Sequence, residues 1–577
     1  MKTKFIYSCG MLLMIMISSC EDDFLELYPL DEISTYDYWK TTKDLKLYVN
    51  KFYLYFDDGD TWSLGIFGSD KETDNQVDIK DIPERLAGIR IVPESGGGWN
   101  FRWIREINYF FENYHHVEEP FDGYKHYVGE AHFFRALFYF DLLKKFGDVP
   151  YISSTLNVDS EELYAPRTPR QQVIDSIVSD LDRAIEYMDS GPNEGGTRLN
   201  KQIARLFKSR VCLYEGTWEK YHDGTLFGVP DPNSGEYLQM AADAALEVIN
   251  SGHYEIFTMG DFENNYYQLF NKNDYSDNPE VMLWEKYSLE LDKTHTHQQY
   301  LVYLGYGIGM TKSIVDDYLC SDGLPTAVSL LYTGDSTLAK VMTNRDPRLN
   351  QTVWEEGDPK AIEDGDTTWV FERSNLGQGG YEGCPTGYQV RKGAIPDPYQ
   401  YETSMHGFTG SIYFRFAEAL LNYAEARTEL GIINQQDLDL TINILRDRVG
   451  MPHLELGNIA NDPDWLFPEL SPLVNEVRRE RRIELACEGF RWDDLARWRA
   501  HELFVGKGPL GIRFDPVMYP DIEVGVTIFL NTEGYVEPFQ KLLQGGQYGF
   551  DPNRDYLDPL PTKELTLNRK LVQNPGW

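Results

Sequence analysis

The densest run of reactive side chains lies between Arg478 and Glu488, where arginines and glutamates follow one another closely. Carboxylates in such a run could transfer protons as general acids or bases. Arg481 and Glu484 stand three positions apart, so on a helix they share a face and can pair. We interpret the run as an ion-pair network that ties a helix, expected over 473–499, to its neighbours. It is therefore predicted to stabilise the fold and not to form a site.

Signatures of catalysis are otherwise missing from the sequence. There is no HExxH, GxSxG, Walker-type phosphate loop or EF-hand loop. The glycines at 305, 307 and 309 do not fit a dinucleotide-binding fingerprint and indicate a flexible loop. His295 and His297 lack the further ligands that a metal needs. We expect no catalytic residue, metal or cofactor, and a surface hydrolase stays a minor alternative.

The informative excess is aromatic, with 38 Tyr, 30 Phe and 12 Trp. An exposed ring can cover the flat C–H face of a sugar, while nearby amides and charged groups bind the hydroxyls. Rings in polar, glycine-rich loops are better binding candidates than rings in helices, although ordinary packing is the alternative for each. The candidates in such loops are Trp62, Trp99 with Asn100, Tyr287, His297, Tyr303, Tyr306 and Trp369.

The N-terminus has the shape of an export signal. Lys2 and Lys4 precede an apolar stretch over 5–17, followed by Ile17-Ser18-Ser19-Cys20. This ending resembles a bacterial lipobox, so residues 1–19 are predicted to be removed and Cys20 to become acylated. The protein would then be held at a membrane by its lipid. No later run of eighteen apolar residues predicts a transmembrane helix.

The formal charge is −38, and −40 once residues 1–19 are removed. A field of this sign repels phosphate backbones, so we expect no nucleic-acid partner. The four cysteines beyond Cys20 are too scattered for a disulfide scaffold and are interpreted as mostly buried small hydrophobes. They are Cys212, Cys320, Cys384 and Cys487.

Helical periodicity divides the chain into three regions. Amphipathic stripes with capping signals predict helices at 127–146, after 168–169, at 198–215 and at 237–251, and again at 411–430, 436–449 and 473–499. Short loops between the first helices suggest stacked helical hairpins. We expect a helical region over 20–254, a loop-rich part with short strands over 255–410, and a helical region with an extended, wrapping tail over 411–577.

Several stretches together resemble the SusD/RagB family of outer-membrane nutrient-binding lipoproteins. They occur in the family's order and span the chain from the lipobox to its last residue. The matching stretches are 129–136 with 139–142 and 146–150, 167–169 with 177 and 180–181, 413–426, 443–451, 480–498, and 560–577. His132 and Trp577 depart mildly from the family pattern.

The resemblance implies a mostly α-helical fold, in which tetratricopeptide-like helical hairpins carry an irregular, loop-rich part. It also implies a surface-exposed, non-catalytic lipoprotein that binds glycans and pairs with a TonB-dependent outer-membrane barrel of the SusC type. A subunit that binds peptides or protein fragments is the alternative within the family. A purely structural lid, with all ligand affinity in the barrel, is a further alternative.

Overall fold

The computed structural model describes residues 38–56 and 61–577. Cys20 and the export signal lie outside the described residues. None of the helices within the described ranges is both long and apolar enough to cross a membrane.

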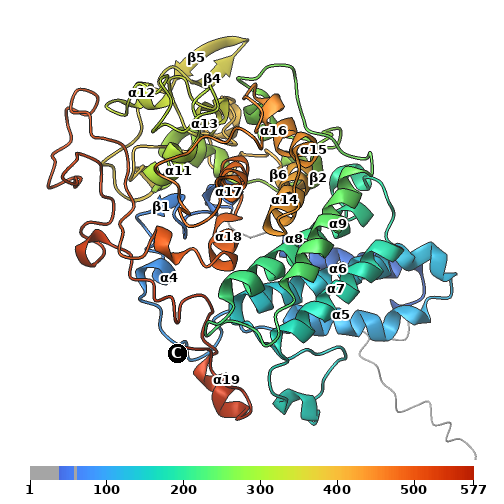
Figure 1. Cartoon of the computed structure of the whole chain (residues 1–577). Coiled ribbons are helices and arrows are strands. Elements are labelled where there is room, and N and C mark those ends of the chain that lie inside the picture. Colours follow the sequence, from blue (N-terminus) through green and yellow to red (C-terminus); the bar gives the residue numbers. More distant parts are fainter. Residues whose placement is uncertain (1–37, 57–60) are drawn as a thin grey trace, which may run out of the picture.

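A row of helices forms one half of the molecule (Figure 1). The members of this half are α3 (Thr42–Asn50), α5 (Arg102–Asn113), α6 (Phe121–Phe146), α7 (Arg170–Tyr187), α8 (Lys201–His222), α9 (Ser234–Ile249) and α14 (Phe416–Glu429). From α5 to α9 each helix packs on the next along the chain, α3 packs on α6, and α14 packs across α8 and α9. The mostly helical fold expected from the sequence is thereby confirmed.

The longest helix, α6, is buried around most of its circumference, as its apolar sequence demands. It begins after Pro120 and ends at Gly147, whose φ of 70° is a backbone angle that glycine adopts without strain. Helix α8 begins at Asn200, whose side chain accepts hydrogen bonds from the backbone N–H groups of Gln202 and Ile203.

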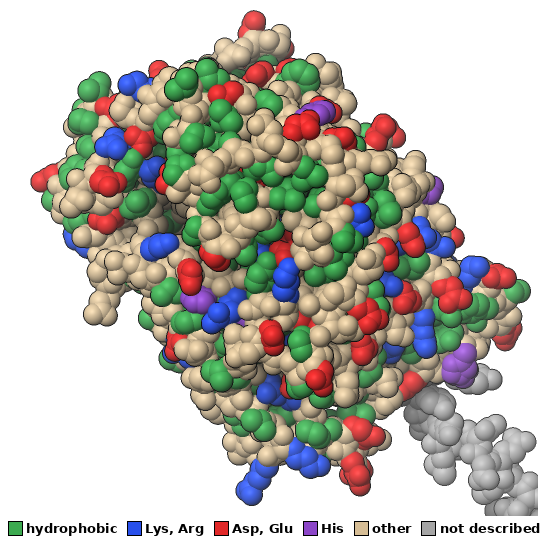
Figure 2. Space-filling model, in the orientation of Figure 1, with side chains coloured by type: hydrophobic (Ala, Val, Ile, Leu, Met, Phe, Trp, Pro, Cys, Tyr) green, Lys and Arg blue, Asp and Glu red, His purple; other side chains and the backbone are tan. Residues whose placement is uncertain are grey.

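The second half consists mainly of loops with short elements (Figure 1). Its helices are α4 (Glu84–Ala87), α10 (Asn265–Leu269), α11 (Lys312–Asp317), α12 (Leu338–Met342) and α13 (Pro347–Thr352). Three antiparallel ribbons stiffen the loops: β1 (Gln76–Asp78) with β3 (Ile308–Met310), β2 (Val281–Glu285) with β6 (Ser411–Arg415), and β4 (Pro359–Glu363) with β5 (Asp366–Val370). Hydrophobic side chains are frequent on this half of the visible face, whereas charges of both signs are interspersed over the helical half (Figure 2).

Three expected helices are corrected by the structure. Residues 411–415 of the predicted helix form strand β6, because they pair with β2. The helix expected over 436–449 is divided into α15 (Gln435–Leu440) and α16 (Ile442–Arg448). The Thr441 hydroxyl donates to the carbonyl of Asp437, which competes with the helical bond at the break.

The helix expected over 473–499 is also two helices, α17 (Pro472–Glu484) and α18 (Arg491–Arg497). Between them Cys487 and Gly489 have φ of 64° and 79°, which no right-handed helix contains. The Asp70 carboxylate accepts hydrogen bonds from both of these backbone N–H groups, at 3.0 and 3.2 Å. A residue from the N-terminal part of the chain therefore stabilises the break.

The arginines and glutamates of α17 form a buried network. Glu484 contacts Arg448 at 2.5 Å, Arg415 at 2.8 Å and Arg348 at 3.0 Å. Burial alone would raise the pKa of Glu484, but these three guanidinium groups hold it well below its usual range. The expected pair between Arg481 and Glu484 is wrong, because Arg481 instead contacts Asp494 at 2.9 Å.

Four cysteines lie in the interior of the molecule. Cys212, Cys320, Cys384 and Cys487 are all buried, as the sequence predicts, and none of them forms a disulfide with another. The tail is extended apart from α19 (Thr562–Leu567), and its last residue, Trp577, lies against Arg90.

Candidate functional site

A hollow of about 380 Å³ lies where the loop before β1, the segment around β3 and strand β6 meet. Its lining combines aromatic rings with hydroxyl and ammonium groups. The lining residues that carry such groups are Phe56, Ser63, Ser69, Lys71, Tyr287, His297, Tyr306, Ser411 and Tyr413. Three of the candidates from the sequence, Tyr287, His297 and Tyr306, are thereby brought together.

Tyr306 is held in an unusual conformation at the edge of this hollow. Its φ is 59°, and its neighbours Gly305 and Gly307 have φ of 82° and 72°. A non-glycine residue with a left-handed backbone conformation is strained by about 1–3 kcal/mol. Residues strained in this way tend to occur at functional sites. The preceding π-helix, Gln299–Leu304, is a second feature that is frequent at such sites.

Aromatic and cationic neighbours fix the ring of Tyr306. The rings of Tyr300 and Tyr381 lie 4.5 and 5.2 Å away between centroids. The Lys80 ammonium lies 3.8 Å from the ring centre and also donates to the Tyr306 carbonyl. Burial lowers the pKa of Lys80, an effect that the nearby Asp78 opposes. The ring is thus positioned before any ligand binds.

Two histidines pack beside Tyr287. The rings of His295 and His297 stack 3.9 Å apart and almost parallel, at 9°. Tyr287 meets His295 edge-on at 4.6 Å. Burial lowers the pKa of His295 to about 4, so this imidazole is neutral near pH 7. His295 therefore presents an uncharged aromatic support for Tyr287.

Trp62 belongs to the segment that leads into the hollow. Its side chain is 54% exposed, and Ser63 and Leu64, which follow it, line the hollow. The carbonyl of Thr61 accepts hydrogen bonds from the N–H and hydroxyl of Thr296, which ties this segment to the two histidines.

Tyr303 and Trp369 form a separate exposed pair, 5.4 Å apart between ring centres. Neither lines the hollow, but Tyr303 is only three residues from Tyr306. Trp369 lies on β5, and the Lys360 ammonium lies 3.9 Å from the indole centre. Burial lowers the pKa of Lys360 to about 8. This pair could provide a second stacking platform.

The structure does not bring Trp99 and Asn100 to the hollow. Trp99 meets Phe101 at 5.3 Å and Phe146, at the end of α6, at 5.0 Å between ring centres. The Asn100 side chain accepts a hydrogen bond from the N–H of Arg102, at the start of α5.

These contacts yield a first prediction. Trp99→Ala should lower the melting temperature, because two ring contacts are lost, and should leave ligand affinity unchanged. A thermal melt and a calorimetric titration on the same sample measure both. Lost affinity at an unchanged melting temperature would instead place Trp99 in the site.

Sequence reasoning missed several residues of this region. Tyr381 follows two glycines, the same signal that singled out other rings, and was overlooked. Phe56, Lys80 and Tyr413 carry no local signal of binding, because only the tertiary fold brings them to the hollow or to Tyr306.

The lining shows what the hollow can do chemically. Over the described ranges, none of its lining residues is Asp or Glu. Its aromatic rings with hydroxyl and ammonium groups beside them suit binding of a polyhydroxylated ligand.

Comparison with known proteins identifies the family. Residues 256–577 match the family model described as "SusD family", and residues 97–213 match one described as "Starch-binding associating with outer membrane". The chain belongs to the SusD family, whose members bind ligands without catalysis and associate with the outer membrane.

Individual relatives cover nearly the whole chain. SusD-like protein P2 of Formosa agariphila is 24% identical, with 98% of each chain covered. A SusD-like protein of Bacteroides fragilis has a TM-score of 0.70 at 23% identity, covering 95% of this chain and 100% of its own. A SusD-like carbohydrate binding protein of the same species has a TM-score of 0.69 at 22% identity, covering 93% and 100%. A laminarin binding SusD-like protein has a TM-score of 0.54 at 18% identity, covering 93% and 100%.

Proposed function

We propose that this protein binds oligo- or polysaccharides in the hollow beside Tyr306 and delivers them to a SusC-like TonB-dependent transporter. The observation that carries the proposal is the lining itself, in which the ring of Tyr306 lies beside hydroxyl and ammonium groups. Relatives described as carbohydrate binding and laminarin binding support the ligand class.

The hollow supplies both parts of sugar recognition. A pyranose ring would stack on Tyr306, whose orientation Lys80 and Tyr381 already fix. Lys71 and Ser411 would then bond to the hydroxyl groups at the ring edge. A longer glycan would extend from there towards Tyr303 and Trp369, while Trp62 would cover its other side.

The ligand class is tested by an array of glycans and peptides. The purified full chain is kept in a detergent without a sugar headgroup, so that the detergent does not compete. We expect binding to glycans and none to peptides. Binding to peptides alone would support the alternative of a peptide-binding subunit, and binding to neither would favour a structural lid.

Attachment to the membrane gives a second prediction. Cys20 is the proposed acylation site, so Cys20→Ala should release the protein from the outer-membrane fraction, whereas Cys9→Ala should not, because Cys9 lies within the segment to be removed. Fractionation and protease accessibility of intact cells measure anchoring and exposure. A Cys20→Ala protein that stays membrane-bound and accessible would contradict lipid anchoring.

Delivery to a transporter is tested separately. A SusC-like barrel should copurify with the wild-type chain from membranes. Absence of such a barrel from the purified complex would argue against delivery while leaving glycan binding intact.

A further inference from the structure

A second cavity, of about 440 Å³, is lined by Asp74, just before β1, and by residues that follow β3. Thr311, directly after β3, lines this cavity, whereas Ile308, at the start of β3, lines the hollow. The two sets of lining residues have no member in common. Its volume is within the range of about 300–1,000 Å³ that is typical of small-molecule sites.

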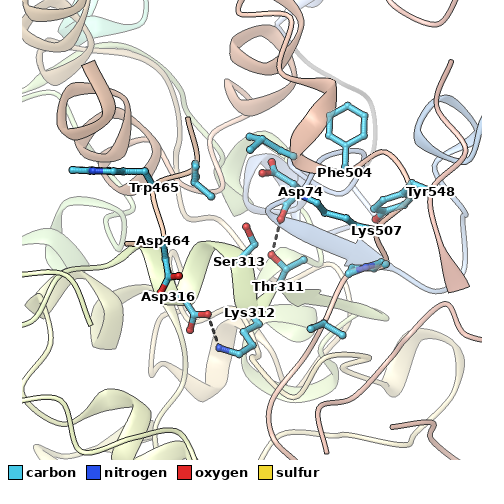
Figure 3. Close-up of a pocket in the computed structure, with 15 residues that line it drawn as sticks. Asp74, Thr311, Lys312, Ser313, Asp316, Asp464, Trp465, Phe504, Lys507 and Tyr548 are labelled. Carbon is cyan, nitrogen blue, oxygen red and sulfur yellow. Dashed lines mark hydrogen bonds and ion pairs between the residues drawn. The ribbon is translucent and has the colours of Figure 1, made fainter. Parts of the chain in front are cut away.

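The cavity has apolar walls and a polar interior (Figure 3). Trp465, Leu503 and Phe504 provide apolar surface. Thr311, Lys312 and Ser313 at the start of α11 and Asp316 near its end provide polar groups. The Arg479 guanidinium lies 4.8 Å from the centre of the Trp465 ring and holds the indole in place.

The charges of the lining are almost balanced. Asp74 is paired with Arg491 at 2.7 Å and Arg482 at 3.1 Å, and Asp316 is paired with Lys312 at 2.5 Å. Within the described chain, the side chains of Asp464 and Lys507 form no hydrogen bond or ion pair, and their charges are opposite. The cavity thus offers one carboxylate and one ammonium to a ligand, and the charges of these two groups cancel.

The buried side chain of Tyr548 is independent support for a ligand site in this cavity. Its side chain is 4% exposed, and its hydroxyl has no hydrogen-bond partner among the described residues. A buried hydroxyl without a partner is destabilising, so buried polar groups are nearly always bonded. Figure 3 shows the hydroxyl end of Tyr548 directed towards the other lining residues.

We propose that this cavity is a second ligand site, which takes a small neutral saccharide. Apolar walls around Trp465 suit the C–H face of a sugar. Lys507 would donate to sugar hydroxyls, Asp464 would accept from them, and the Tyr548 hydroxyl would gain its missing partner. Balanced charge disfavours anionic and cationic ligands, since either would leave one of these two groups facing a like charge.

The test uses cellobiose, laminaribiose and maltose at millimolar concentration with the full chain in the same detergent. Saturation-transfer NMR detects binding, and a thermal melt reports folding. Tyr548→Phe should weaken the disaccharide that binds by roughly 2- to 10-fold, because one hydrogen bond is lost. Its melting temperature should not fall, because the hydroxyl has no protein partner. Lys507→Gln, at an exposed position, should weaken binding similarly.

Matched variants separate this site from the hollow. In Tyr139→Phe the lost hydroxyl is bonded to the carbonyl and N–H of Ile152, so the melting temperature should fall while disaccharide binding persists. Tyr306→Ala should also keep the disaccharide signal. The proposal is overturned if none of the three disaccharides binds, or if Tyr548→Phe and Lys507→Gln bind as the wild type does. Loss of the signal in Tyr306→Ala alone would assign it to the hollow and overturn the second site.

Discussion

Arg482→Ala should lower the free energy of unfolding by about 3–5 kcal/mol, the usual cost of removing one partner of a buried ion pair. Arg482 is 2% exposed and contacts Asp74 at 3.1 Å and Asp317 at 3.0 Å. Its guanidinium also donates to the Asn75 side chain at 2.8 Å. The alanine would leave two carboxylates buried with fewer partners. Chemical denaturation of wild type and variant measures the loss.

Arg373→Ala is the matched control for this prediction. Arg373 is 44% exposed at its side chain and lies 4.0 Å from Asp521, so its pair should contribute no more than about 1 kcal/mol. Glycan affinity of the folded Arg482→Ala protein should hardly change. If affinity fell while stability held, α17 would belong to the binding site and not to the scaffold.

Tyr306→Ala should weaken glycan binding by roughly 30-fold, because truncating a well-placed aromatic anchor commonly costs at least about 2 kcal/mol. The anchor is already oriented by Lys80 and Tyr381, so little entropy is lost on binding. Tyr306→Phe keeps the ring and should keep most of the affinity. Calorimetric titration with the best glycan from the array measures all three proteins.

Tyr399→Ala controls for the loss of an exposed ring elsewhere. Tyr399 is 56% exposed and does not line the hollow, so its variant should bind as the wild type does. Equal affinity of Tyr306→Ala and wild type would remove the strained tyrosine from the site.

The sequence predicted the helical scaffold well, because most of its helices carry local signals. Apolar periodicity and the glycine at 147 located α6, whose C-terminal end is where the pattern placed it. The two-helix structure of 473–499 was missed because its break depends on Asp70, more than 400 positions away in the sequence. Strand β6 was missed for the same kind of reason, since only pairing with β2 makes it a strand.

The candidate site was predictable only in part. Glycine-flanked rings in polar loops singled out Tyr306, which the structure places at the hollow, and its role in binding stays a prediction. The same signal at Trp99 leads to a ring packed on Phe146, because local sequence does not show which loops fold back onto the scaffold. Phe56 and Tyr413 reach the hollow through long-range contacts, which no local pattern encodes.

The central claim is that the hollow beside Tyr306 binds glycan, and a crystal structure of the protein with the best glycan from the array tests it most directly. We expect a sugar ring stacked on Tyr306, with hydroxyl groups near Lys71 and Ser411 and an uncleaved glycosidic bond. Glycan bound elsewhere on the protein, with the hollow empty, would contradict the claim.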